Sequence, residues 1–248
     1  MKSSRGEDPM PQQEDQSVDV LASFPEHQQL EITSVKQLQG WKNRQRYRIY
    51  FMELSLEVHE NTMIKFRMLK GSRFTRTELE EIVQADEKQQ AYAAGLAFLG
   101  RKPRTRYELT VRLTEKGWAE GVAEQTADRL EQEGYLDDAA YAVEWAQQRL
   151  ESKGKGKMWI RQELRQKGIS KPYIEAALEQ VDEETEFESA RTIAEKRWQR
   201  TNGEPAERKR KVGAFLMRRG FKGSVVSKVI RSLSEADDDW TLNEEADF

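Results

Sequence analysis

Two adjacent carboxylates are the first residues of this chain that could perform chemistry. Asp137 and Asp138 follow Gly134-Tyr135-Leu136, and paired carboxylates can hold a divalent metal or divide acid–base work between them. No other acid stands at ligand spacing nearby, and aspartate is a preferred residue at a helix N-cap. We therefore expect the pair to begin a helix, and we predict no catalytic residue, no metal site and no cofactor. A carboxylate-dependent nuclease using both residues is the alternative.

A lysine–glycine segment is the second candidate site. Residues 153–157 read Lys-Gly-Lys-Gly-Lys, but they lack the Gly-x4-Gly-Lys-Ser/Thr spacing of a phosphate loop and no strand precedes them. A flexible loop with three lysines suits contact with phosphates or with an acidic protein instead. A solvated loop without any partner is the competing interpretation.

Basic residues also cluster around the start of one expected helix. Thr105 and Glu108 have the spacing of a capping box, and five bases lie between residues 101 and 112. A single base near a helix end can be explained by its favourable position there, but five bases cannot. We therefore expect a partner to bind here. The bases that we predict to contact this partner lie at loops and helix ends: Arg101, Arg104, Arg106, Arg112, Lys153, Lys155, Lys157, Arg161, Arg165, Arg218 and Arg219.

The residue types of most hydrolases and metalloenzymes are scarce. The chain has no cysteine, which excludes disulfides, thiolate nucleophiles and cysteine zinc sites. Its two histidines, His27 and His59, have no partners that would complete a triad or a metal site. We accordingly predict that the protein is not an enzyme.

The net charge of −3 conceals an uneven distribution along the chain. Residues 1–30 carry −4 and residues 234–248 carry −7, which leaves +8 for residues 31–233. A basic body with acidic tails is typical of proteins that meet nucleic acid or nucleoprotein, although tails that merely solvate the chain would look the same. No run of about 18 apolar residues could span a membrane, and residues 1–30 do not resemble a secretory signal. We expect a cytoplasmic monomer with no membrane contact.

A repeated pattern dominates the second part of the chain. Three stretches share a leucine four residues before a glycine, namely Leu113 with Gly117, Leu164 with Gly168, and Leu216 with Gly220. The glycines are 51 and 52 residues apart, and an apolar residue also precedes each by eight positions on the same helical face. Glycine suits the left-handed residue that ends a helix. We therefore expect three equivalent helices that end at these glycines.

Further helices complete each repeat. Ahead of each glycine, small residues four apart would let another helix approach closely: Ala93 and Ala97, Ala142 and Ala146, Ala190 and Ala194. A third helix is expected after each glycine. Before the first repeat, alternating residues predict strands over 46–51 and 54–58, followed by a helix over 60–70 and a short helix from Thr75 to Val83.

The predicted fold is mainly α, with three tandem helix-turn-helix-like repeats in an elongated array after a small β-hairpin-plus-helix module. The expected divisions are a disordered acidic tail over 1–30, the small α/β module over 31–85, three-helix repeats over 86–138, 139–184 and 185–234, and a disordered acidic tail over 235–248.

Four segments together resemble the RecX family of bacterial regulators of the RecA recombinase. They are Arg-Lys-Pro-Arg-Thr-Arg-Tyr-Glu-Leu (101–109), Gly-Tyr-Leu-Asp-Asp (134–138), Ile-Arg-Gln-Glu-Leu-Arg-Gln-Lys-Gly-Ile (160–169) and Arg-Arg-Gly-Phe (218–221). The resemblance covers about residues 88–233, and the segment 31–85 resembles the extension of longer members. Asp138 and the repeated leucines and glycines would then be structural.

The resemblance implies a function that the residues alone do not. RecX proteins bind in the groove of the RecA filament on single-stranded DNA, where they mainly inhibit strand exchange, ATP hydrolysis and co-protease activity. The chain would thus regulate recombination, DNA repair and the SOS response. A helix-turn-helix-type protein that binds DNA directly is the alternative function.

Overall fold

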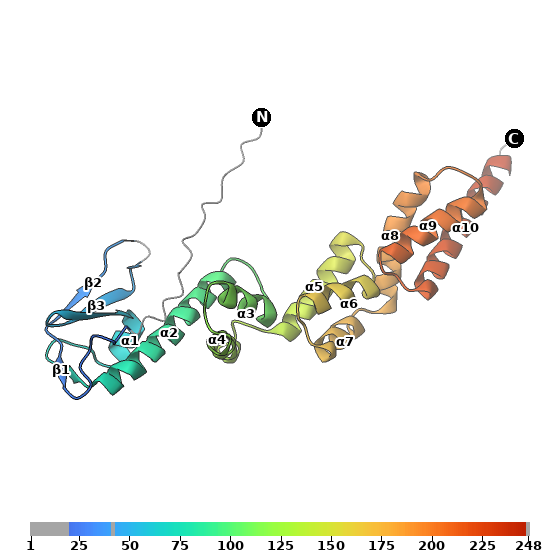
Figure 1. Ribbon diagram of the computed structural model, residues 1–248. Coiled ribbons are helices and arrows are strands. Elements are labelled where there is room, and N and C mark those ends of the chain that lie inside the picture. Colours follow the sequence, from blue (N-terminus) through green and yellow to red (C-terminus); the bar gives the residue numbers. More distant parts are fainter. Residues whose placement is uncertain (1–19, 41–42, 247–248) are drawn as a thin grey trace. The chain divides into compact units, whose positions relative to one another are not determined.

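The computed structural model describes residues 20–40 and 43–246, with side chains described as far as Glu235 (Figure 1). The chain divides into two compact units, one formed by residues up to Lys102 with Leu109–Tyr135, the other by Pro103–Glu108 with the residues from Leu136 onward. Each unit is described by itself. None of the described helices has the length and apolarity that a membrane span requires.

The first unit begins with two small antiparallel sheets. A three-stranded sheet has the order β2-β3-β4, and its strands are Ser34–Gln37, Arg46–Phe51 and Leu54–His59. A second pair joins β1 (Leu30–Glu31) to β5 (Arg73–Phe74). The strands predicted over 46–51 and 54–58 are confirmed, and Ile49 with Phe51 and Leu56 with Val58 are buried at alternate positions.

Residues 20–30 correct the prediction of an acidic tail over 1–30. Leu21 and Phe24 are 2% and 3% exposed, and the Phe24 ring meets the edge of Phe51 at 5.7 Å. A turn places both side chains on one side, since the Phe24 N–H donates to the Leu21 carbonyl at 2.8 Å. Two apolar residues thus anchor a segment whose average polarity had suggested disorder. Residues 1–19 lie outside the described residues.

The helices that follow differ in length from the prediction. Helix α1 (Glu60–Lys65) ends before Gly71, because Arg67 takes a positive φ of 51°. Helix α2 (Arg76–Leu99) starts at the expected Thr75–Glu78 capping box but runs without a break through the boundary predicted at 85/86. The N-terminal module and the first repeat therefore share one helix.

Asp86 ties this shared helix to the sheet. Its carboxylate, 3% exposed for the residue, accepts from Arg46 Nη1 at 2.9 Å and from the His59 backbone N–H at 2.5 Å. Gln90, one turn further along α2, donates to the same carboxylate at 2.8 Å. The Asp86 carboxylate therefore has hydrogen-bond partners in the sheet and in α2. Its polar side chain is compatible with a position in the middle of the helix.

His59 gives the first unit a pH-dependent stability. Burial lowers the pKa of His59, and the nearby Asp86 carboxylate only partly opposes this effect. The unfolded chain, with a histidine pKa of about 6.5, then binds more protons than the folded chain. The contribution of neutral His59 to the free energy of unfolding is therefore complete above that pH. It falls as the pH drops towards the lower pKa of the folded state. We expect His59→Asn, which keeps an N-cap acceptor for Asn61, to flatten this dependence in urea unfolding at pH 7.5 and 5. An equal loss of stability in both proteins would contradict it.

Helices α3 (Arg106–Glu115) and α4 (Glu120–Gln132) continue the first repeat. Helices α2 and α4 pack closely at Gly95, where an added Cβ would lie 2.8 Å from Leu130 Cδ1. The buried small residues of α2 are Ala91 and Gly95, whereas Ala97 is exposed. The predicted pair Ala93 and Ala97 is therefore wrong by two residues.

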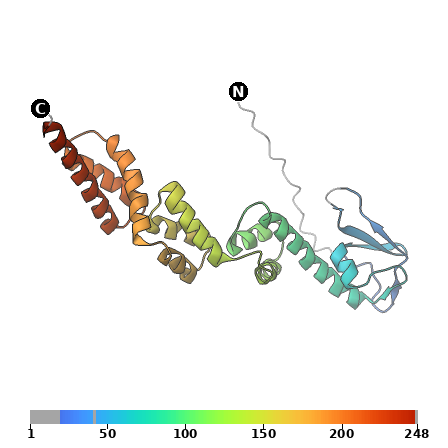
Figure 2. The same ribbon diagram turned by 180° about the vertical axis from the view of Figure 1, so that it is seen from behind.

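The second unit holds two complete three-helix repeats. The first of them comprises α5 (Asp138–Lys153), α6 (Lys157–Gln166) and α7 (Lys171–Glu179). The next comprises α8 (Glu183–Gln199), α9 (Pro205–Arg218) and α10 (Gly223–Ala246), and α10 lies against α8 and α9 (Figure 2). Because α10 continues to Ala246, the disordered tail predicted from 235 is wrong for residues 235–246, where a continuous helical backbone is found.

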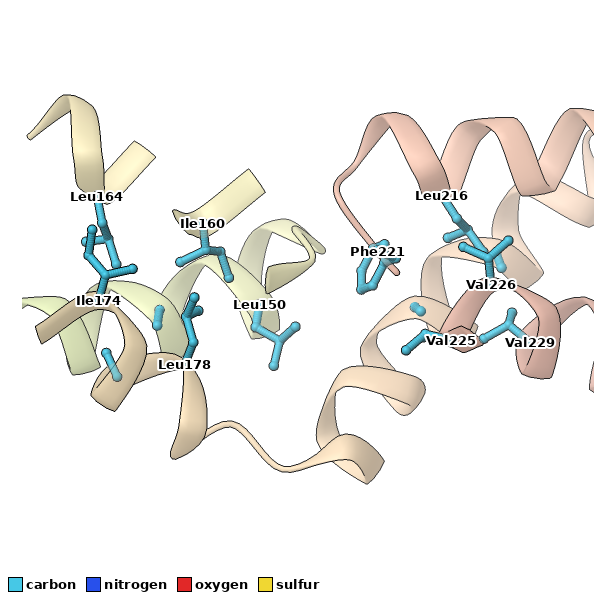
Figure 3. Packing of buried hydrophobic residues seen from close by; sticks show 14 of the residues in the cluster. Leu150, Ile160, Leu164, Ile174, Leu178, Leu216, Phe221, Val225, Val226 and Val229 are labelled. Atoms are coloured by element: carbon cyan, nitrogen blue, oxygen red, sulfur yellow. The ribbon is translucent and has the colours of Figure 1, made fainter. Parts of the chain in front are cut away.

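The core of this unit follows the repeat. The predicted small pairs on α5 and α8 are fully buried at Ala142, Ala146, Ala190 and Ala194. Leucines and valines fill the space between the helices of each repeat, with Leu164 facing Ile174 in one and Leu216 beside Val226 in the other (Figure 3). Each helix supplies an apolar stripe that only its neighbours can cover, which explains the tandem arrangement.

Candidate recognition surface

A shared junction holds successive repeats of the second unit together. The backbone N–H groups of Gly156 and Met158, at the start of α6, donate to the carbonyls of Arg219 and Gly220 at 2.9 and 3.0 Å. Gly220 has a φ of 85°, and a Cβ there would lie 2.4 Å from the Trp159 nitrogen. Only glycine therefore allows the turn after α9 to meet the start of α6.

The start of α3 makes the equivalent contact with the turn after α6. Thr105 Oγ1 donates to the Lys167 carbonyl at 2.7 Å, and a Cβ on Gly168 would lie 2.2 Å from Tyr107 Cβ. The capping box predicted at Thr105 and Glu108 is present. Gly117, by contrast, has a φ of 97° and open space around the position of a Cβ.

A carboxylate completes each junction. Asp138, the first residue of α5, accepts from the Arg106 N–H at 2.9 Å, and Glu186 of α8 accepts from the Lys157 N–H at 3.3 Å. Asp137 caps α5 by accepting from the Ala140 N–H at 2.8 Å. Both members of the acidic pair thus hold helix starts, and the described residues contain no group of three or more possible metal ligands.

The lysine–glycine segment is part of a junction and is not a flexible loop. Gly154 ends α5 in the left-handed conformation and Gly156 precedes α6, and both glycines are buried. The Lys157 side chain is 13% exposed and donates from Nζ to the Val181 carbonyl at 2.5 Å, with Glu186 at 3.9 Å. The prediction of a flexible loop is wrong, because buried contacts with the following repeat fix this segment.

The remaining predicted bases, apart from Lys155, fall into three groups. Several are engaged within the protein: Arg161 forms two bonds to Glu175, Arg219 Nη1 donates to the Lys153 carbonyl at 2.7 Å, and Arg112 pairs with Glu115 at 3.2 Å. Arg104 and Arg106 are half-buried at the junction of α3. The others are exposed, namely Arg101, Lys153, Arg165 and Arg218.

One concentration of positive charge lies in the first unit. We define the Lys116 cluster as Arg101, Arg112 and Lys116. Burial lowers the pKa of Lys116, and repulsion from Arg112 and Arg101 lowers it further. The Lys116 ammonium stands 6.0 Å from the centre of the Trp118 ring. Because these bases repel one another, an anionic partner would be attracted to this place.

A second concentration has the same features in the second unit. We define the Lys155 cluster as Arg149, Lys155 and Arg219. Burial lowers the pKa of Lys155, and repulsion from Arg219 and Arg149 adds to the effect while Glu163 opposes it. Its ammonium lies 3.9 Å from the centre of the Trp159 ring.

The prediction included Arg101, Arg112, Lys155 and Arg219 of these clusters but missed Lys116 and Arg149. Lys116 stands just before a repeated glycine, as Lys167 and Arg219 do, so the repeat alone could have indicated it.

Comparison with known proteins places this arrangement in a family. Family profiles of the first, second and third three-helix domains of RecX match residues 91–141, 137–178 and 184–230. Regulatory protein RecX of Limosilactobacillus reuteri (strain DSM 20016) is 32% identical over 200 residues, which are 80% of this chain and 76% of that protein. The chain belongs to the RecX family. Regulatory protein RecX of Geobacillus kaustophilus (strain HTA426) is 30% identical over 71% of this chain and 66% of that protein.

Solved RecX structures share the fold. A crystal structure of regulatory protein RecX matches with a TM-score of 0.69 at 30% identity, covering 81% of this chain and 98% of that one. RecX from Lactobacillus salivarius matches with a TM-score of 0.58 at 25% identity over 60% and 98% of the two chains. The predicted fold class, three tandem three-helix domains after a small sheet module, is confirmed for a RecX protein.

Proposed function

We propose that this chain regulates the bacterial RecA recombinase without catalysis, by docking in the groove of the RecA filament on single-stranded DNA. The observation that carries the proposal is its membership of a family of regulatory proteins, with all three RecX domains present. Docking would mainly inhibit strand exchange, ATP hydrolysis and co-protease activity. The chain would then act in recombination, DNA repair and the SOS response in the cytoplasm.

The basic clusters support docking on a nucleoprotein. A filament on DNA presents phosphates, and the body of this chain carries +8 between residues 31 and 233. The Lys116 and Lys155 clusters concentrate that charge beside tryptophan rings, where burial, and then repulsion from neighbouring arginines, lowers the pKa of each lysine. The exposed bases Arg101, Lys153, Arg165 and Arg218 would add to the attraction, whereas Lys157 and Arg161 mainly hold the fold.

Charge reversal in the two clusters tests this docking. We expect Lys116→Glu with Lys155→Glu to raise the concentration that half-inhibits RecA ATPase on single-stranded DNA by roughly tenfold, since two attractive charges become repulsive. The new carboxylates would face arginines of their own clusters, so the fold should persist.

Lys70→Glu with Lys171→Glu is the matched control, because both lysines are exposed and the net charge changes equally. Equal losses in the two double variants would remove the clusters from the docking surface. Tight binding of wild-type chain to duplex DNA without RecA, with a steep salt dependence, would favour the direct DNA-binding alternative.

A further inference from the structure

The first unit contains a groove that the proposed docking surface does not use. It lies between α1, α2 and α4, has a volume of about 640 Å³, and is bounded on one side by the N-terminal module, which the three matched RecX domains do not cover. This volume is in the range of ligand-binding pockets, roughly 300–1,000 Å³. The groove is therefore large enough to hold several groups of a bound molecule.

The charge that lines this groove has one sign. Its ionisable cations are Lys65, Lys88 and Arg129, and no lining residue is acidic. Lys65 and Lys88 are exposed, and neither forms an ion pair with another described residue. Arg129 is paired with Glu133, so the two lysines supply the uncompensated charge that favours an anionic ligand.

Contacts with three neighbouring side chains fix the position of the Arg129 guanidinium. Its Nε donates to Glu133 at 2.8 Å, its Nη1 donates to Gln89 Oε1 at 3.3 Å, and its guanidinium lies 3.7 Å from the centre of the Tyr92 ring. The Tyr92 hydroxyl also bonds to Glu133. A planar guanidinium fixed in this way loses little freedom when it binds an oxyanion.

A buried hydroxyl among the residues that line the groove lacks a partner. Thr62 is 3% exposed, and its Oγ1 has no hydrogen-bond partner among the described residues. A buried hydroxyl without a bond costs about 1–3 kcal/mol. A buried water would supply the missing bond, because the hydroxyl is too enclosed to contact a ligand in the groove.

We propose that this groove binds the phosphates of a single-stranded nucleic acid. Phosphate oxygens accept from lysine, arginine, amide and hydroxyl donors together, which are the groups that line the groove. A strand presents several phosphates in succession, which matches cations contributed by three separate helices. The choice of a single strand rests on the proposed function, whereas the phosphate chemistry rests on the groove itself.

The test measures binding of a fluorescent oligothymidylate to the full chain by anisotropy at several salt concentrations, without recombinase. Lys65→Gln with Lys88→Gln should weaken binding by at least about tenfold at low salt and reduce the slope of log affinity against log salt by about 1.4, because each lost phosphate contact removes roughly 0.7.

Lys36→Gln with Lys70→Gln provides the control, since both lysines are exposed and lie in the same unit away from the groove lining. The control should bind as the wild type does. An equal loss in the control or an unchanged salt slope in Lys65→Gln/Lys88→Gln would overturn the site. So would displacement of the strand by a glutamate peptide at equal charge concentration. Because recombinase is absent, such a failure would leave the docking proposal untouched.

Discussion

Replacing Gly168 or Gly220 by alanine is expected to lower the free energy of unfolding by about 3 kcal/mol or more. A residue with a Cβ in the left-handed conformation costs roughly 1–2 kcal/mol, and forcing extra atoms into a packed site adds about 1–3 kcal/mol. At Gly220 the new Cβ would meet the Trp159 backbone at 2.4 Å, which cannot rotate away. At Gly168 it would meet Tyr107 Cβ at 2.2 Å.

Gly117→Ala is the matched control for these variants. Gly117 shares the positive φ but has open space where the Cβ would stand, so we expect it to lose only about 1–2 kcal/mol. Urea unfolding followed by tryptophan fluorescence measures the three midpoints. Equal losses at Gly117, Gly168 and Gly220 would show that the glycines serve only the end of each helix, without any junction between repeats.

Removing the Glu186 carboxylate should have the second large effect. Glu186 is 2% exposed, and it accepts from the Lys157 N–H while its other oxygen faces Lys157 Nζ at 3.9 Å. Glu186→Ala would leave the Lys157 ammonium, with a side chain 13% exposed, and the start of α6 without this carboxylate. We expect the free energy of unfolding to fall by about 3 kcal/mol. Glu186→Gln keeps an acceptor oxygen and should lose only about 1 kcal/mol.

Glu184→Ala isolates the role of the junction from the general effect of an acid near the start of α8. Glu184 stands two residues earlier in the same helix and is exposed, so its removal should change the unfolding midpoint little. Heat or urea unfolding of the three variants distinguishes the cases. A Glu186→Ala midpoint equal to that of Glu184→Ala would mean that the carboxylate does not stabilise the junction.

The features that recur with a fixed period could be predicted from the sequence. Gly117, Gly168 and Gly220 all take a positive φ, of 97°, 77° and 85°. The leucines four residues before them, Leu113, Leu164 and Leu216, are at most 1% exposed. Helical periodicity and the conformational freedom of glycine are local properties, so they can be read directly from residue spacing.

The alignment of the first repeat with the later ones could not be predicted from the sequence. Residue type alone pairs Ala93 and Ala97 with the later alanines. The buried small residues of α2 are instead Ala91 and Gly95. Gly95 stands 51 residues before Ala146, the same interval that separates Gly117 from Gly168. Glycine stands at this position, where an added Cβ would lie 2.8 Å from Leu130 Cδ1, and a local pattern does not show such a contact between distant residues.

The roles of individual bases could not be predicted for the same reason. Lys153, Lys155 and Lys157 look alike in sequence, yet Lys153 is exposed, Lys155 stacks on Trp159 and Lys157 is tied to Glu186. Charge density along the chain identified the basic regions. Only the packing of the following repeat decides which of these side chains can still reach a partner.

The most direct measurement is the ATPase activity of RecA on single-stranded DNA, with and without this chain at increasing concentration. Docking of a RecX protein on the filament predicts a saturable decrease in ATP hydrolysis, with no nucleotide or DNA turnover by the chain alone. Unchanged hydrolysis at saturating concentration, or cleavage of the DNA by the chain, would contradict it.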